Sequence, residues 1–143
     1  MKVVADTNIL VSGSLWGGPS RRLVELALEG RLIIGASDVL FTEFCRVMHY
    51  PKFQARLLDL KYTVDDVVAN ARHFLTTIRR VSVTPAVSPD PPDNEVLACA
   101  VDFNADVIIS GDHHILDLGS SFQNIQIMRV SEFVEKLFPA EKQ

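Results

Sequence analysis

Short apolar runs alternate with longer amphipathic stretches along this chain of 143 residues. Runs of three or four apolar residues are typical of strands buried on both faces of a parallel sheet, and apolar spacings of three and four are typical of helices packed on it. The predicted strands are residues 3–5, 32–35, 81–83, 107–110 and 125–128. Strands that alternate with helices predict βαβ units, and therefore an α/β fold: a three-layer α/β/α sandwich around a mainly parallel, twisted sheet.

Capping and breaking residues mark where the helices begin and end. Ser20, Ser37, Thr63 and Ser131 each precede an amphipathic stretch and predict N-caps. The clearest helix follows Thr63 and carries an apolar stripe that reaches Ile78. The predicted helices are residues 21–29, 38–49, 53–60, 64–78, 93–103, 113–118 and 132–138.

Length and composition predict one ordinary globular domain, residues 1–138, with a frayed tail at 139–143. The hydrophobic fraction of 48% and the charged fraction of 22% are those of a globular protein, and no apolar run approaches the ~18 residues of a membrane helix. Three apolar residues between Lys2 and Asp6 are too few for a signal peptide. We therefore expect a cytoplasmic protein with no membrane partner.

Four acidic residues are predicted to meet at one edge of the sheet. Asp6 and Asp112 follow predicted strands, and the carboxyl ends of parallel strands lie side by side where the strand order reverses. Glu43 lies near the start of the helix that leaves the second strand, and Asp93 opens a helix after a proline-rich loop. Both helix starts face the edge at which Asp6 is expected.

Each acid also has an ordinary structural interpretation. Asp6 and Asp112 are common turn and cap residues, and Asp93 is a suitable N-cap. Glu43 precedes Arg46 by three residues, the spacing of a surface ion pair. The case for function therefore depends on the combination of the four.

A cluster of carboxylates requires a cation. Two carboxylates 4 Å apart repel by ~4 kcal/mol at an effective dielectric constant of about 20. Oxygen ligands select Mg²⁺ or Mn²⁺, and no CxxC or HxxxH pair suggests zinc, since Cys45 and Cys99 are predicted to be free core thiols. Such an ion lowers the pKa of a bound water and stabilises charge on a phosphoryl oxygen, which points to hydrolysis of a phosphodiester.

Four segments together resemble the PIN domain family. They are VVADTNILVS at residues 3–12, Glu43 in its capped helix, DNEVLACA at residues 93–100 and ADVIISGD at residues 105–112. The closest resemblance is to toxins of bacterial toxin-antitoxin systems, the VapC-type ribonucleases. It extends from Lys2 to about Leu137, and the order and spacing of the four segments carry it.

The resemblance implies a Rossmann-like sandwich and an Mg²⁺- or Mn²⁺-dependent endoribonuclease that cleaves single-stranded RNA through metal-activated water. It also implies a cognate antitoxin and a homodimer as partners. By position, the catalytic, metal-binding acids are Asp6, Glu43, Asp93 and Asp112, and Asn8 and Ser110 support them. Asp90 is an open alternative to Asp93 as the third ligand, and His113 and His114 are candidate phosphate contacts.

Other functions stay open at this point. The net charge of −4 disfavours general attraction to nucleic acid, although Arg21, Arg22, Arg46 and Lys52 could form a local basic rim. A non-catalytic RNA- or protein-binding module is the main alternative. A phosphatase with an aspartate nucleophile is disfavoured because Asn8 stands where a second Asp is needed. A phospho-receiver domain is also disfavoured, because this chain lacks the acidic pair that such a domain needs after its first strand.

Overall fold

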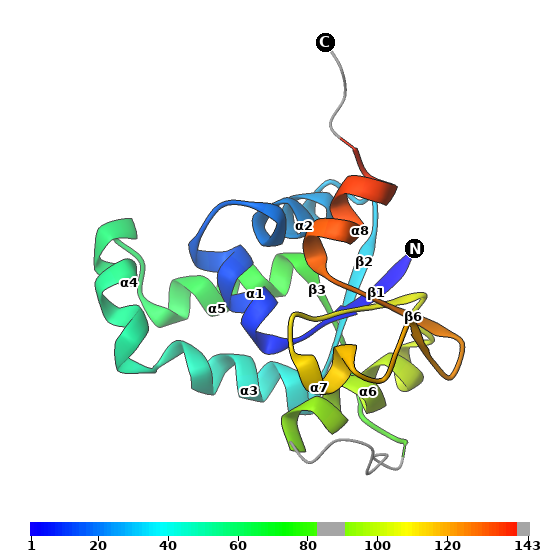
Figure 1. Ribbon diagram of the computed structural model, residues 1–143. Helices are drawn as coiled ribbons and strands as arrows, with labels where there is room; N and C mark the ends of the chain where they lie inside the picture. Colours follow the sequence, from blue (N-terminus) through cyan, green and yellow to red (C-terminus); the bar gives the residue numbers. More distant parts are fainter. Residues whose placement is uncertain (83–90, 140–143) are drawn as a thin grey trace.

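Six strands form one sheet within the part of the chain that the computed structural model describes, residues 1–82 and 91–139 (Figure 1). The strands are β1 (Lys2–Ala5), β2 (Ile33–Ser37), β3 (Leu75–Ile78), β4 (Val107–Ile109), β5 (Ser121–Phe122) and β6 (Ile125–Met128), in the order β3-β2-β1-β4-β6-β5. All neighbours are parallel except β5, which pairs antiparallel with β6 at one edge. The predicted mainly parallel sheet is confirmed.

Helices cover both faces of the sheet and complete the α/β/α sandwich. The helices are α1 (Thr7–Leu15), α2 (Pro19–Leu28), α3 (Asp38–Met48), the 3-10 helix η1 (Pro51–Phe53), α4 (Gln54–Leu60), α5 (Val64–Phe74), α6 (Pro91–Phe103), α7 (His113–Leu116) and α8 (Val130–Leu137). The larger hydrophobic core joins α1–α5 and α8 to one face, and the smaller joins α6 and α7 to the other. None of the described helices is long and apolar enough to cross a membrane.

The central strand shows why its sequence is apolar at successive positions. Val3 and Val4 point to opposite faces of β1, and neither has any exposed surface, because each face carries its own core. On the neighbouring strand, a Cβ built at Gly35 would lie 2.5 Å from the Phe103 ring. A glycine there lets α6 pack directly on β2.

The region after Thr63 differs from the prediction. Thr63 forms the expected cap and a capping box with Asp66, but α5 ends at Phe74 and Leu75–Ile78 form β3 beside β2. Apolar side chains at 74, 75 and 78 fit a helix as well as a strand, and the β-branched Thr76, Thr77 and Ile78 favour the strand. The predicted strand at 81–83 is wrong for Val81 and Ser82, and residue 83 lies outside the described residues.

Several boundaries also differ. The predictions lacked α1 and β5, and they placed the caps of α2 and α8 at Ser20 and Ser131 instead of Gly18 and Arg129. Pro19 explains the first shift, since proline at the first helical position leaves no N–H unsatisfied. The cap at Ser37 and the left-handed Asn104 (φ 53°) are confirmed. Cys45 and Cys99 are free thiols, as expected.

Candidate active site

Asp6 directly follows the carboxyl end of β1. The strand order reverses at β1, which lies between β2 on one side and β4 on the other. Asp6 is also the N-cap of α1: its Oδ1 accepts a hydrogen bond from the Ile9 N–H at 3.0 Å. Its Oδ2 accepts from the Ser110 hydroxyl at 2.5 Å. Asp6 is therefore held from two elements with only 7% of its surface exposed.

The environment of Asp6 disfavours its negative charge. Burial raises the pKa of the Asp6 carboxyl above the ordinary 3.8, and the nearby Asp112 adds to this. Hydrogen bonds from Ser110 and from the backbone N–H groups of Ile9 and Gly111 partly offset the increase. Among the ion pairs between described residues, none involves Asp6. A cation beside Asp6 would remove this penalty.

Ser110 connects Asp6 with Asp112. It follows β4 and is fully buried. While its hydroxyl donates to Asp6, its Oγ accepts from the Asp112 N–H at 3.0 Å. The Asp112 side chain then caps α7, because Oδ1 accepts from the His114 N–H at 2.8 Å. The supporting position predicted for Ser110 thus has a definite contact.

Glu43 approaches from the second turn of α3, and Asp93 approaches from the first turn of α6. Asp93 lies within α6 and not at its cap, because the helix already includes Pro91, and only 5% of Asp93 is exposed. Glu43 is half-buried and paired with Arg46, at 2.6 Å from Oε1 to Nη2 and 3.1 Å from Oε2 to Nε. The surface ion pair predicted for Glu43 is therefore present. Arg46 also donates a hydrogen bond to the Tyr50 hydroxyl at 2.7 Å.

One cavity of about 220 Å³ brings the four acids together. We call it the acid cavity, and its lining is Asp6, Thr7, Asn8, Glu43, Val47, Tyr50, Lys52, Pro92, Asp93, Val96 and Asp112. The four carboxylates arrive on separate segments: the end of β1, α3, α6 and the turn after β4. Asn8, which the resemblance predicts to support the acids, also lines this cavity and is exposed. Asp90 lies outside the described residues.

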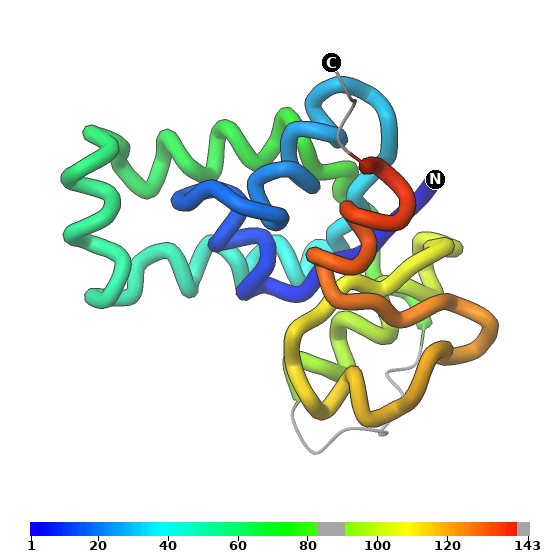
Figure 2. Tube along the Cα trace, turned by 45° about the horizontal axis from the view of Figure 1, so that its top comes forward, coloured from blue at the N-terminus to red at the C-terminus, as the bar shows by residue number. Residues whose placement is uncertain are grey.

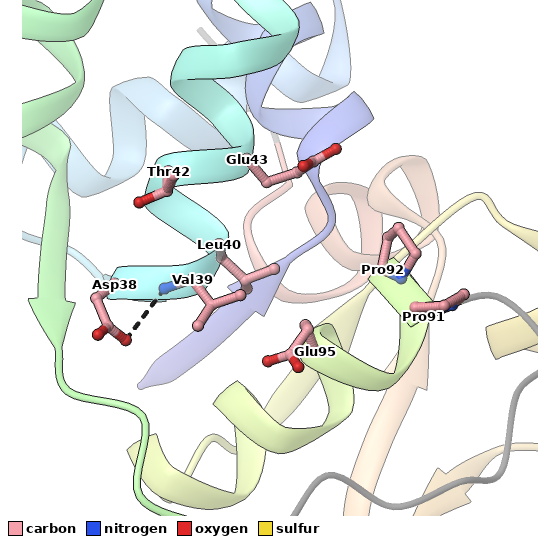
Figure 3. Close-up of a pocket in the computed structure, with 8 residues that line it drawn as sticks. All are labelled: Asp38, Val39, Leu40, Thr42, Glu43, Pro91, Pro92 and Glu95. Atoms are coloured by element: carbon pink, nitrogen blue, oxygen red, sulfur yellow. Dashed lines mark hydrogen bonds between the residues drawn. The ribbon is translucent and has the colours of Figure 1, made fainter.

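Two further hollows adjoin the acid cavity. Asp6, Asn8 and Asp112 are shared with a hollow of about 470 Å³ that His113 also lines. Glu43 and Pro92 are shared with a hollow of about 450 Å³ between the starts of α3 and α6. Figure 3 shows Glu43 reaching from α3 away from Asp38, toward the side on which Pro92 lies. The carboxylate of Glu43 therefore stands at a boundary between two hollows.

The basic residues considered for a rim divide into two groups. Lys52 lines the acid cavity, and Arg46 is close to it through Glu43. Arg21 and Arg22 instead pair with Glu25 on their own helix, α2, and Arg22 also pairs with Glu29, the C-cap of that helix. His113 and His114, predicted only as candidate phosphate contacts, also form a group with Asp112 whose ligand atoms lie within 4.8 Å of one another. This proximity could not be predicted, because it depends on the side-chain directions in the turn and not on the spacing in the sequence.

The donor set fits a hard divalent cation. Four carboxylates line the acid cavity, two of them are more than nine-tenths buried, and Lys52 is the one lysine or arginine among the described residues that line it. Oxygen ligands of this kind suit Mg²⁺ or Mn²⁺ and not a soft metal. The histidines beside Asp112 lie at the margin, where an imidazole ligand is also available.

Comparison with known proteins agrees with this geometry. A family model for the PIN domain matches residues 2–114, which include all four acids. PIN domains are generally nucleases and typically use divalent metal ions. No curated protein matches the chain. Because the matched segment covers more than three-quarters of the 143 residues, the chain belongs to the PIN domain family.

Proposed function

We propose that this protein is an Mg²⁺- or Mn²⁺-dependent endoribonuclease that cleaves phosphodiester bonds of single-stranded RNA. The observation that supports this most directly is the acid cavity, in which four carboxylates from four segments of the chain face one space. Carboxylates gathered at the carboxyl edge of a parallel sheet repel one another, so such a cluster is stable mainly with a cation. Nuclease chemistry is also the general activity of the family.

Each acid has a role in this proposal. Asp6, Asp93 and Asp112 would hold the ion, and Glu43 would assist from the rim. A bound divalent cation supplies a water of lowered pKa and neutralises charge on the phosphoryl oxygens. The Ser110 hydroxyl and the Ile9 N–H fix the orientation of Asp6, so the carboxylate needs little reorganisation during the reaction.

Because the net charge of the protein is −4, RNA binding would depend on positive charge close to the acid cavity. Lys52 is exposed, lines the acid cavity and has no carboxylate partner among the described residues. Its ammonium group can donate hydrogen bonds to a phosphate of the RNA next to the acids. Asn8, exposed at the rim, can donate from its amide to a phosphate or to water.

An Asp6→Asn variant tests the proposed chemistry. The substitution keeps an N-cap at the start of α1 and removes the charge that would bind metal. We expect cleavage of a generic single-stranded RNA with Mn²⁺ to fall by on the order of 100-fold or more. Asp59→Asn, an exposed acid on α4, is the matched control and should cleave like the unaltered protein. Full activity of Asp6→Asn would exclude Asp6 as a metal ligand.

We further propose a biological role as the toxin of a cytoplasmic toxin-antitoxin pair, acting as a homodimer. The support is the resemblance of the four acidic segments to VapC-type ribonucleases. Induced expression in a bacterial host should arrest growth, and Asp6→Asn should not. A gene for a small DNA-binding protein in the neighbouring reading frame, whose co-expression restores growth, is the expected antitoxin. Growth unaffected by the active nuclease would contradict the toxin role.

A non-catalytic RNA- or protein-binding module is the second candidate. It is favoured by the ion pair in which Arg46 engages both oxygens of Glu43, and by the net charge of −4. Such a module would bind its partner equally well with or without a divalent metal. An absence of RNA cleavage in both Mg²⁺ and Mn²⁺, with unchanged partner binding, would favour it.

A further inference from the structure

A separate cavity of about 430 Å³ lies at the opposite end of α1 from Asp6 and has no part in the roles given above. Side chains from α1, α2, α4, α5 and their connections line it, and those that carry polar or aromatic groups include Trp16, Arg21, Arg56, Tyr62 and His73. We call it the α1 end cavity. Its residues share no member with the acid cavity.

Arg56 is a positive charge held in place in this cavity. Its Nε donates to the Leu15 carbonyl at 2.7 Å, and its guanidinium lies 5.6 Å from the centre of the Trp16 ring. Arg56 is half-buried and forms no ion pair with any described residue. Within the described part of the chain its two terminal nitrogens also make no hydrogen bond. They are therefore free to hold an anion.

The other arginine of the cavity is already compensated. Arg21 lies 3.5 Å from a carboxylate oxygen of Glu25 and donates to the Gly13 carbonyl. By contrast, the aromatic side chains near Arg56 remain open, with Trp16 41% and Tyr62 43% exposed. A fixed guanidinium beside exposed aromatic rings is the combination with which proteins bind single-stranded nucleic acid, the charge taking a phosphate and the rings a base.

The two cavities lie at different points along the same two neighbouring helical segments. α1 begins at the acid cavity with Thr7 and Asn8 and ends at Trp16, so its nine residues separate the cavities by about 13 Å. Lys52 of η1 lines the acid cavity, and α4, which follows directly, carries Arg56 and packs against α1. Figure 2 shows α3, α4 and α5 as a U around α1 and α2, which lie between its arms. A few nucleotides can span this distance.

We propose that the α1 end cavity is a subsite for single-stranded RNA, in which Arg56 binds a backbone phosphate and the exposed rings of Trp16 and Tyr62 contact a base. The subsite rests on the proposed ribonuclease function and extends it: RNA that reaches Arg56 is held at a second point a few nucleotides from the acids. A strand too short to reach both cavities would lose this contact.

Tryptophan fluorescence gives a direct test, because Trp16 is the only tryptophan of the chain. The probe is a fluorescein-labelled single-stranded RNA of about 12 nucleotides, titrated with chelator present to prevent cleavage. Anisotropy of the label measures total binding, and an unlabelled copy of the RNA is used to follow Trp16. We expect the RNA to quench Trp16 fluorescence. Arg56→Gln should weaken binding by about tenfold and reduce the slope of log K against log salt concentration by about one, the value for one phosphate contact.

Lys2→Gln is the matched control, since it removes one positive charge at the amino end of β1, away from both cavities. It should bind like the unaltered protein. Because Arg56 also supports the end of α1, Tyr62→Ala provides a second variant that leaves the Leu15 contact intact and should weaken binding as well.

The two proposals fail in different ways. RNA that binds by anisotropy without changing Trp16 fluorescence, and with equal affinity in Arg56→Gln, Tyr62→Ala and Lys2→Gln, would overturn the subsite and leave the ribonuclease proposal standing. No RNA binding by the intact protein in this titration would also overturn the subsite, whereas the ribonuclease proposal is decided separately by the cleavage assay with Mn²⁺. Quenching of Trp16 together with selective loss in Arg56→Gln and Tyr62→Ala supports the subsite.

Discussion

Asp6 shows how one side chain can serve the fold and the site together. One oxygen caps α1 through the Ile9 N–H, and the other accepts from Ser110 on the neighbouring strand end. The sequence presented the cap and the metal ligand as alternatives, but a carboxylate has two oxygens with two lone pairs each, so the two roles are compatible. The same holds for Asp112, which caps α7 while facing the acid cavity.

The buried position of Asp6 predicts an unusual pH dependence. The folded protein raises the pKa of this carboxyl, chiefly through burial, so the folded state favours the protonated form. Its contribution to stability is therefore present below the ordinary pKa of 3.8 and is lost as the pH rises through the folded value. Without metal, Asp6→Asn should melt at a higher temperature than the unaltered protein at pH 7, and the difference should shrink toward pH 4.

Thermal melts with a chelator present, over a pH series, measure this difference. Asp59→Asn, which changes the same charge on an exposed surface, should show no comparable trend. An Asp6→Asn variant that melts below the unaltered protein at pH 7 would mean that ionised Asp6 stabilises the metal-free fold, contrary to the burial argument.

At the level of single elements, the packing of α6 on β2 depends on Gly35. The Phe103 ring occupies the space of a Cβ at this position, and Phe103 is itself buried. Gly35→Ala should cost about 1–3 kcal/mol of unfolding free energy, because neither the ring nor the strand can move without disturbing the core. Urea unfolding would measure the loss.

Gly17→Ala is the control for this prediction, since no atom lies within 4 Å of a Cβ there, and its effect should stay within about 0.5 kcal/mol. Adding Phe103→Leu to Gly35→Ala should recover part of the lost stability if the clash is the cause. Equal effects of the two alanine substitutions would show that the contact with Phe103 is not restrictive.

The sequence predicted most elements but failed where local patterns are ambiguous. The strands at β1, β2 and β4 were found because they contain continuous apolar runs between clear helix signals, and β6 was found although the exposed Gln126 interrupts its apolar residues. β3 was not found, because Leu75 and Ile78 continue the apolar stripe of α5, and the β-branched residues of the segment favour a strand too weakly to decide without the pairing with β2. α1 was missed because its apolar residues surround most of the helix and give little amphipathic pattern.

Across the whole molecule, the sheet order explains why the site could be foreseen in part. β1 lies between β2 and β4, so the residues that follow β1 and β4 are brought together by topology alone, as are the helix starts at the same edge. The Arg46 pair with Glu43 was also visible as a three-residue spacing. The α1 end cavity was not foreseeable, because Trp16 and Arg56 are separated by 40 positions and meet only through the packing of α1 on α4.

If the four acids form a divalent metal site, the stability of the folded protein must depend on the metal concentration, and a metal titration measures this dependence. Metal that binds only the folded state stabilises it by RT ln(1 + L/Kd), where L is the free metal concentration, so the melting temperature rises as the metal concentration exceeds Kd. We predict that Mn²⁺ raises the melting temperature of the unaltered protein and of Asp59→Asn, and has little effect on Asp6→Asn. No Mn²⁺-dependent shift in the unaltered protein, or an equal shift in all three, would mean that Asp6 and the acids around it do not bind the metal.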